Sequence, residues 1–229
     1  PGGTAGLAAT VSERWTVTGS AGQSSRFPTL SQLWGSQSGN RNLRAEVARR
    51  CEAGVDGRPV PAVQTEGVVF WNDLRDLIDR DLRRGGRYEN IRSARTWGAE
   101  TTGALRLSDR AELQLSYTYT RSRNRDTDQP LDLVPRHKAD GRLVLQTHGG
   151  DTQWALLVTR AGSRYDDEAL TADRTLPAYT TADCRITTRL ARFLAVSLDI
   201  RNLGDACYEE EVMFPAPGRS VLFTALLDF

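Results

Sequence analysis

The sequence is almost without lysine, histidine and cysteine, and its charges of opposite sign nearly cancel. Lys138 is the only lysine among 30 basic residues, and 29 acidic residues leave a formal net charge of +1. Because no basic excess is present to attract a phosphate backbone, nucleic acid is not expected as a partner. The three cysteines, Cys51, Cys184 and Cys207, are odd in number and far apart. They match neither a disulfide framework nor the spacing of metal ligands.

Long apolar runs are also missing. A membrane-spanning helix needs about 20 consecutive apolar residues, whereas the longest apolar runs are residues 154–158 and 221–227. This excludes a bundle of membrane helices. A hydrophobic content of 39% in 229 residues is, taken alone, typical of one or two soluble domains. A transmembrane β-barrel is not excluded, because only about half of its strand residues are apolar.

The sequence also lacks a recognisable start and recognisable catalytic motifs. It has no initiator methionine, charged leader or apolar leader segment, so we expect it to begin inside a longer protein. No G-x-S-x-G, H-E-x-x-H or phosphate-binding glycine loop occurs. The two histidines, His137 and His148, offer no metal site. We therefore predict neither an enzyme nor a bound cofactor.

What the sequence does contain is alternation with a period of two. From Ala111 to Thr120, leucine and tyrosine alternate with polar residues, which is the pattern of a half-buried strand. One short helical turn is predicted over Thr29–Trp34, and long helical periodicity is absent. The pattern predicts eleven strands, near 3–12, 14–26, 43–55, 62–78, 87–107, 110–122, 136–147, 152–164, 177–190, 193–204 and 219–229.

The predicted connections alternate between short and long. Tight turns are predicted at 12–14, 56–59, 108–110, 148–151 and 190–192. Long polar segments are predicted at 27–42, 79–86, 123–135, 165–176 and 205–218. Short turns on one side and long loops on the other are typical of outer-membrane β-barrels. The pattern therefore favours an all-β, antiparallel transmembrane barrel.

The last predicted strand supports this interpretation. Apolar residues stand at alternate positions from Val221 through Phe223 and Leu227 to the terminal Phe229. In a soluble protein such an end would be an ordinary core strand, prone to fraying. In an outer-membrane barrel the same strand closes the sheet, faces lipid and presents its last residue to the assembly machinery. The asymmetry of the turns favours the second interpretation.

Four sequence blocks carry a resemblance to a known family. They are residues 26–34 (RFPTLSQLW) with 39–46 (GNRNLRAE), 72–78 with 88–91 and 94–100, 134–138 (VPRHK), and 201–205 with 208–209, 217–220 and the terminal Phe229. In this order the chain resembles the C-terminal half of a TonB-dependent outer-membrane receptor. Phe27, Ala45 and Gly204 depart from the residues common in that family. The matching positions are Arg26, Pro28, Leu30, Leu33, Asn42, Glu46, Asn90, Gly98, Glu100, Pro135, Arg136, His137, Asn202, Asp205, Tyr208, Pro217, Gly218 and Arg219.

The resemblance implies a fold and a function. The fold would be a plugged barrel of roughly 22 strands, of which residues 1–229 form the C-terminal part. The plug domain and the first strands would lie outside the chain. The implied function is TonB-dependent uptake of a ferric siderophore, cobalamin or similar scarce nutrient across a Gram-negative-type outer membrane. The implied partners are the TonB complex, reached through the missing N-terminal region, outer-membrane lipid, the barrel-assembly machinery and a large small-molecule ligand.

Site residues are harder to assign than the fold. Trp34, Tyr88, Arg164 and Tyr165 lie at or beside predicted loop tips and are candidates for ligand contact. The alternative for the aromatic residues is a girdle at the membrane interface. We interpret most family-motif positions as architectural, with Arg136 and His137 as a polar pair that faces the lumen.

One further segment and several alternatives stay open. Residues 124–132 resemble a calcium-binding loop, but they lack the glycine at position six and the glutamate at position twelve of an EF-hand. A passive porin would have the same barrel without a plug, and a barrel enzyme would need a convergent nucleophile and base. A soluble β-sandwich binding module is the third alternative.

Overall fold

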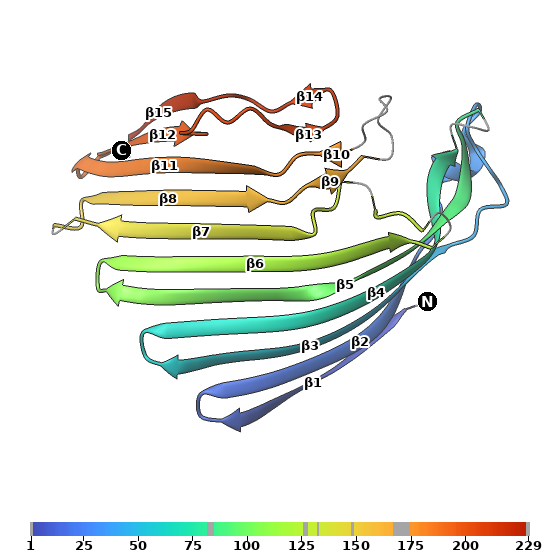
Figure 1. The fold of residues 1–229 in the computed structure, drawn as a ribbon, viewed down its shortest axis with the longest axis horizontal. Coiled ribbons are helices and arrows are strands. Elements are labelled where there is room, and N and C mark those ends of the chain that lie inside the picture. The colour runs from blue at the N-terminus through green and yellow to red at the C-terminus, as the bar shows by residue number, and fades with distance from the viewer. Residues whose placement is uncertain are drawn as a thin grey trace. The chain divides into compact units, whose positions relative to one another are not determined.

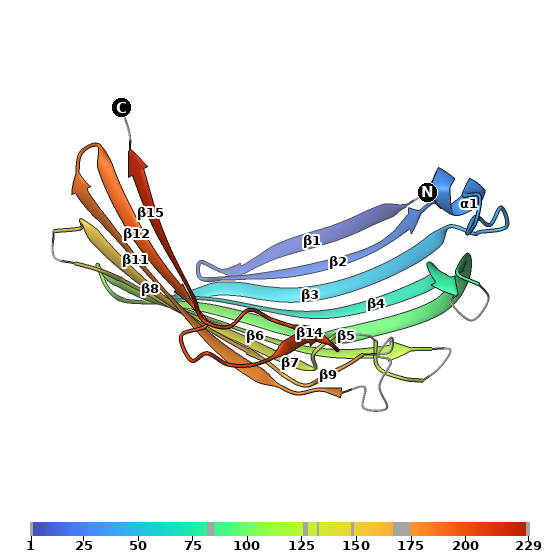
Figure 2. The ribbon, with the colours of Figure 1, turned by 90° about the horizontal axis from the view of Figure 1, so that it is seen from above.

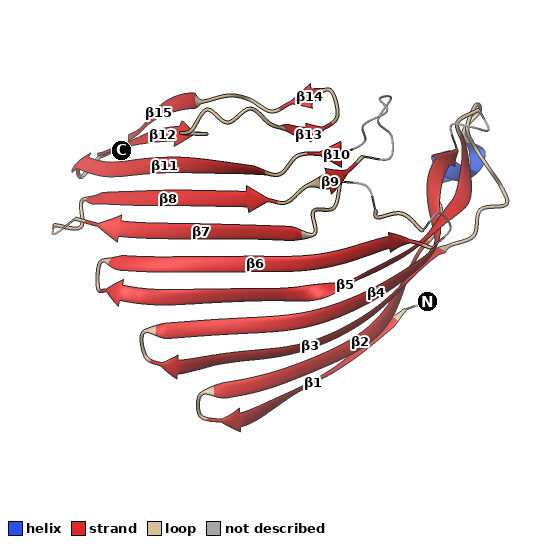
Figure 3. Ribbon diagram, in the orientation of Figure 1, coloured by secondary structure: helices blue, strands red, loops and turns tan. Residues whose placement is uncertain are grey.

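The computed structural model describes residues 2–81, 85–125, 128–131, 133–147, 149–166 and 175–227, without the side chains of residues 79, 81, 91 and 92. Within these ranges the chain forms fifteen strands and one short helix (Figure 3). Eleven strands form one antiparallel sheet in the order β1-β2-β3-β4-β5-β6-β7-β8-β11-β12-β15 (Figure 1). Sequential hairpins of this kind are the connectivity of an up-and-down barrel wall.

The strands of this sheet are long. Their bounds are β1 (Gly3–Ser12), β2 (Trp15–Arg26), β3 (Glu46–Val60), β4 (Val63–Asp81), β5 (Arg87–Ser108), β6 (Ala111–Asn124), β7 (His137–Gln146), β8 (Thr152–Ala161), β11 (Tyr179–Ala191), β12 (Leu194–Arg201) and β15 (Ser220–Leu227). Each of the eleven predicted strands corresponds to one of them, so the all-β antiparallel prediction is confirmed. The helix α1 (Leu30–Trp34) confirms the predicted helical turn. Of the described helical residues, none belongs to a helix long and apolar enough to cross a membrane.

One predicted turn is wrong. The Asp56–Pro59 segment was expected to turn because it combines aspartate, glycine and proline. The structure continues β3 through it, with Gly57 buried, and turns instead at Pro61–Ala62. The fixed φ of a proline suits the first central position of a turn, and Pro61 stands in such a place.

Four short strands were not predicted. They are β9 (Arg164–Tyr165), β10 (Thr175–Leu176), β13 (Glu209–Glu211) and β14 (Phe214–Pro215). Strand β9 pairs with β10, and β13 pairs with β14. Two or three residues are too few to show a period of two. The sequence pattern therefore could not predict these strands.

The register places one kind of residue on each face of the sheet. Leu113 of β6 pairs with Leu143 of β7, which pairs in turn with Leu156 of β8. One position later the partners are Gln114 and Arg142. Since side chains alternate between the faces, one face is apolar and the other predominantly polar. In a barrel these faces meet lipid and lumen respectively.

The chain divides into two compact units. Unit 1 comprises residues 1–55, 68–99 and 120–131, and unit 2 comprises residues 56–67, 100–119 and 132–229. Within unit 1, α1 lies beside the end of β2 and the start of β3 (Figure 2). Unit 2 contains the successive strands β7, β8, β11, β12 and β15.

Neither unit has the dense apolar core of a soluble domain. Among the described apolar residues, the buried ones are Ile78 and Ala94 in unit 1 and Ala161 and Leu176 in unit 2. Large apolar side chains of the sheet are instead exposed, for example Leu115 at 55% and Phe223 at 66%. Such exposure is a liability in water and is normal for a surface that faces lipid.

Candidate functional site at the loop-side ends of the strands

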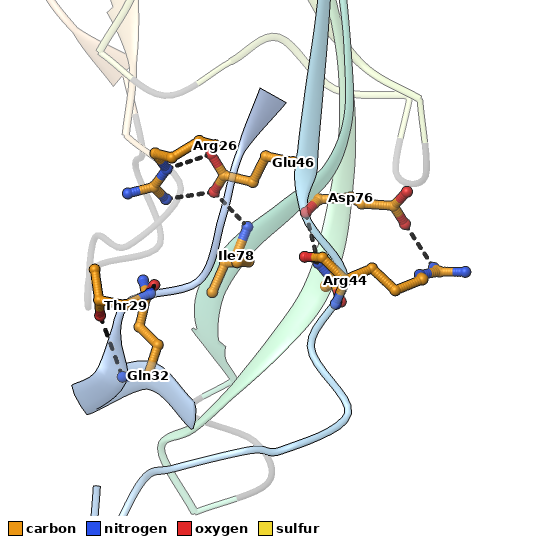
Figure 4. Close-up of polar contacts among 8 residues, drawn as sticks. Arg26, Thr29, Gln32, Arg44, Glu46, Asp76 and Ile78 are labelled. Atoms are coloured by element: carbon orange, nitrogen blue, oxygen red, sulfur yellow. Dashed lines mark hydrogen bonds and ion pairs between the residues drawn. The ribbon is translucent and has the colours of Figure 1, made fainter. Parts of the chain in front are cut away.

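The long connections and the strand ends next to them carry most of the family-motif residues. In unit 1, Arg26 at the end of β2 forms an ion pair with Glu46 at the start of β3 (Figure 4). The same Glu46 carboxylate accepts a hydrogen bond from the backbone N–H of Ile78 in β4, at 2.9 Å. One carboxylate therefore joins three neighbouring strands at the base of a loop.

The helix α1 has a complete N-terminal cap. The Thr29 hydroxyl accepts from the Gln32 backbone N–H at 3.3 Å, and the Gln32 side chain accepts from the Thr29 N–H at 2.9 Å (Figure 4). This reciprocal pair is a capping box. It holds the helix that ends at Trp34, a residue that is 58% exposed. The Arg41 guanidinium carbon lies 3.8 Å from the centre of that ring, which is a cation–π contact.

Asn90 and Asn40 connect further segments of unit 1. The Asn90 side chain accepts from the Arg44 N–H at 2.8 Å and donates to the carbonyl oxygens of Arg44 and Asp76. The Asn40 side chain donates to the Tyr88 carbonyl at 2.8 Å, and the Tyr88 N–H donates to the Ser38 carbonyl at 2.9 Å. The loop that carries Trp34 is thereby tied to the start of β5. Trp34 and Tyr88, both predicted for ligand contact, belong to these linked segments.

In unit 2, Asn202 organises the connection after β12. It is 5% exposed and has a φ of 50°, a conformation that asparagine tolerates better than most residues. Its side chain accepts from the Ala206 N–H and donates to the Ala206 carbonyl, each at 2.9 Å. Its backbone N–H donates to the Asp183 carboxylate at 2.8 Å. Asn202 therefore holds a turn of the loop through these hydrogen bonds.

Asp205 and Gly218 bring the two ends of that connection together. The Asp205 carboxylate accepts from the Arg219 backbone N–H at 2.7 Å. A Cβ atom at Gly218 would meet the same carboxylate oxygen at 2.9 Å, closer than real Cβ contacts. A larger residue here would push the Asp205 carboxylate away from the Arg219 N–H, and Pro217 before it restricts the chain direction.

Arg164 and Tyr165 form the short strand β9. Arg164 is 8% exposed, donates to the Glu209 carbonyl at 2.5 Å, and lies 5.1 Å above the Tyr179 ring. The Tyr165 carbonyl accepts from the Leu133 N–H at 2.7 Å. The Arg164 guanidinium thus braces one loop against another, an arrangement closer to a structural role than to open ligand contact.

Tyr208 completes this group in unit 2. Its ring stacks on Tyr179 with 4.0 Å between the centroids and 18° between the planes. Burial raises the pKa of the Tyr208 phenol above its ordinary value, because the charged phenolate is poorly solvated there. The loop after β12 is therefore packed against the start of β11.

His137 does not face the lumen as predicted. It begins β7, and its Nδ1 lies 2.7 Å from the Tyr117 hydroxyl, with its ring against Tyr119. Tyr117 and Tyr119 share the face of Leu115, so His137 lies on the apolar face of the sheet. The prediction failed because the start of a strand after a long loop fixes no register, and a shift of one residue exchanges the faces.

The remaining motif positions lie along the strands and connections. Pro28, Leu30 and Leu33 flank or belong to α1, with Leu30 78% exposed. Asn42 donates its backbone N–H to the Asn40 side chain at 3.0 Å. Gly98 and Glu100 lie within β5, and Pro135 and Arg136 precede β7. Val221, Phe223 and Leu227 pair with Ile200, Leu198 and Leu194 of β12, whereas Phe229 lies outside the described residues.

The segment that resembles a calcium-binding loop, residues 124–132, contains a turn and an ion pair. Asp128 donates its backbone N–H to the Asn124 carbonyl at 2.9 Å, and its carboxylate pairs with Arg123, which lowers the pKa of Asp128. Asp126, Thr127 and Asp132 lie outside the described residues. Among the residues that the structure does describe, no group of three histidines, cysteines or acidic residues could hold a metal ion.

A charged cluster in unit 1 was missed by the sequence analysis. Asp73 in β4 is 1% exposed and contacts Arg75 at 2.8 Å, Arg125 at 3.2 Å and Arg95 at 3.4 Å. Asp73 and Arg75 are two positions apart, but Arg95 comes from β5 and Arg125 directly follows β6. Only strand pairing brings the four together.

A groove also lies on the apolar face of unit 2. It has a volume of about 780 Å³ and is lined by Gly103, Leu115, Gly141, Leu156 and Val158 among others. The two glycines leave room between the larger side chains. In a barrel this face meets lipid.

Comparison with known proteins decides the family. The model of the family described as "TonB dependent receptor-like, beta-barrel" matches residues 3–203. The chain belongs to the TonB-dependent receptor family. This family consists of outer-membrane receptors and transporters rather than enzymes, and the predicted outer-membrane location is confirmed.

Individual relatives agree with the family. The iron-regulated outer membrane virulence protein of Vibrio cholerae serotype O1 is 27% identical over 219 residues, covering 83% of this chain and 33% of the relative. The vitamin B12 transporter BtuB of Vibrio vulnificus is 25% identical over 193 residues, covering 83% of this chain and 30% of the relative. The chain therefore spans about a third of the length of these curated relatives.

Solved structures show the same fold at low identity. The copper transporter OprC superposes with a TM-score of 0.85 at 18% identity, covering 100% of this chain and 38% of that one. A mutant of the ferric enterobactin receptor PfeA of Pseudomonas aeruginosa superposes with a TM-score of 0.84 at 22% identity, covering 100% of this chain and 40% of that one. At this identity the likeness shows the fold alone.

Proposed function

We propose that this chain is the C-terminal part of the barrel of a TonB-dependent receptor that takes up a scarce nutrient. The observation that carries the proposal is the family match over residues 3–203. Uptake would be driven by the TonB complex, which would act through a plug domain outside residues 1–229. The described wall and loops would surround the pathway and contribute to ligand capture.

The edges of the sheet support the idea that further strands are needed. Strand β1 pairs with β2 and β15 pairs with β12, so each stands at an edge of the described sheet. Unpaired backbone groups at such edges are costly in lipid. Closing the barrel would satisfy them, with β15 as the closing strand that the assembly machinery recognises.

For the ligand, we propose a ferric siderophore, cobalamin or a similar large chelate. The relatives named above are described as iron-regulated, as a vitamin B12 transporter and as a ferric enterobactin receptor. The described groups best placed for such a ligand are Trp34, with its exposed ring, and Tyr88, which is tied to the same loop. Aromatic and cationic groups at loop tips suit a large, partly apolar chelate.

Uptake measurements with the complete receptor test this function. Cells that produce it should accumulate radioactive iron supplied as siderophore complexes, or radioactive cobalamin, only when TonB is present. Uptake of the same solutes that persists without TonB would instead indicate a passive porin. Replacing Trp34 by Ala should weaken binding of the transported chelate about tenfold if the ring is an anchor, whereas Leu30→Ala, at another exposed position of the same helix, serves as the matched control.

A further inference from the structure

The Asp73 cluster lies on the outward face of the sheet. On β4, Asn72 contacts Arg50 at 3.3 Å and Thr96 at 3.1 Å, which places these polar groups on one face. Asp73 follows Asn72 and therefore points to the opposite face. That face of β4 also carries Val69, which is 57% exposed. In a barrel the face with exposed apolar residues meets lipid.

Neighbouring strands confirm this assignment. The Arg95 guanidinium carbon lies 5.4 Å from the centre of the Trp71 ring, and that of Arg121 lies 5.9 Å from the centre of Trp97. Trp71 stands two positions before Asp73, and Arg121 shares its face of β6 with Tyr117 and Tyr119. The cationic groups therefore lie directly beside an outward aromatic band.

The position of the cluster along β4 indicates its depth in the membrane. A strand crosses a bilayer in about 9–11 residues, and β4 leaves its short turn at Pro61–Ala62. Asp73 therefore lies about one crossing length from the turn, where the strand passes from hydrocarbon to headgroups. Since long loops are extracellular in this class of barrel, this is the headgroup level of the outer leaflet.

The charges of the cluster do not balance. Three guanidinium groups, those of Arg75, Arg95 and Arg125, surround the single carboxylate of Asp73. Their side chains keep exposures of 48%, 41% and 42%, whereas the Asp73 side chain keeps 1%. The Arg95 Nε is buried and has no hydrogen-bond partner among the described groups. Among the described residues of this cluster, three guanidinium groups against one carboxylate leave an excess of two positive charges on half-exposed side chains, which suits an anionic ligand.

We propose that Arg75, Arg95 and Arg125 bind the phosphate groups of a lipid headgroup in the outer leaflet. Guanidinium groups bind phosphate through paired, charge-assisted hydrogen bonds. Asp73 orients the three arginines by accepting from each of them, and the indole rings of Trp71 and Trp97 lie at the level where the acyl chains begin. The site requires the outer-membrane location but is independent of nutrient uptake.

Lipid titration of the complete receptor in detergent tests the site. The probes are diphosphorylated lipid A, the same lipid without its phosphates, and inorganic phosphate, with bound lipid counted by native mass spectrometry. Because a basic residue contributes about 1 kcal/mol to binding an anionic membrane surface, Arg95→Gln with Arg125→Gln should weaken binding of the phosphorylated lipid about 30-fold. The dephosphorylated lipid should bind equally to both proteins.

A single substitution and a control keep the test decisive. Arg125→Gln alone should weaken binding of the phosphorylated lipid about fivefold. Arg50→Gln removes one charge from the opposite face and should leave the binding of this lipid unchanged. Equal binding of the two lipids to the unaltered receptor would overturn the proposal. An unchanged preference for the phosphorylated lipid in the substituted receptors would also overturn it. Displacement of the lipid by equimolar inorganic phosphate would show a free-anion site and would also overturn it.

Discussion

At the scale of single residues, Asn202 shows how one side chain holds a loop. It is buried, it adopts a φ of 50°, and its amide bonds to both backbone groups of Ala206. Asn202→Ala would leave those groups without partners, which costs about 1–3 kcal/mol for a buried group. We expect a lower midpoint of urea unfolding for the complete receptor, measured by tryptophan fluorescence.

A matched variant separates the two contributions of Asn202. Asn202→Gly keeps the freedom to adopt a positive φ but loses the same hydrogen bonds. It should be less destabilised than Asn202→Ala, by about 1 kcal/mol. If the alanine variant unfolds at the same urea concentration as the unaltered receptor, Asn202 does not stabilise the loop.

Glu46 offers a second prediction for a single residue. It accepts from Arg26 and from the Ile78 backbone N–H, and its side chain is 13% exposed against 57% for Arg26. Glu46→Ala should therefore destabilise the receptor by about 1–3 kcal/mol, since it leaves a backbone donor unpaired. Arg26→Ala removes only an exposed partner and should cost about 0.2–1 kcal/mol. Equal losses in urea unfolding would contradict this account.

At the scale of elements, β6 allows the two faces of the sheet to be compared directly. Leu115 lies on the apolar face and is 55% exposed, and Gln114 lies on the other face. Leu115→Arg should destabilise the barrel by about 2–4 kcal/mol, because the charge would enter lipid. Gln114→Arg, with the charge facing the lumen, should have little effect. The measurement is reversible unfolding in lipid vesicles, and the opposite order would show that the faces are assigned wrongly.

The helix α1 is an element whose loss should stay local. Thr29→Ala removes half of the capping box, which costs about 1 kcal/mol. Because α1 has only five residues, the expected result is faster proteolysis within residues 27–45 with an unchanged global unfolding midpoint. Ser31→Ala, within the same helix, is the control. A fall in global stability after Thr29→Ala would mean that the loop is coupled to the whole wall.

At the scale of the whole molecule, the edge strands decide what the chain can do alone. β1 and β15 each have one partner strand among the described strands. We expect residues 1–229 produced alone to give no heat-modifiable band on a detergent gel. The backbone N–H and C=O groups at the open edges of the sheet would have no hydrogen-bond partners in lipid. The complete receptor should give such a band. A folded, heat-modifiable form of the isolated chain would contradict the idea that further strands are required.

The sequence by itself determined the eleven long strands, their antiparallel order and the apolar face, because a period of two is a local property of each strand. The four motif blocks and the cap at Thr29 were local signals as well. The tertiary structure decided what depends on register and on distant neighbours. It placed the turn at Pro61–Ala62, moved His137 to the apolar face and buried Arg164 under another loop. It also brought Arg95 and Arg125 to Asp73, because contacts across neighbouring strands follow from pairing and have no trace in the order of residues.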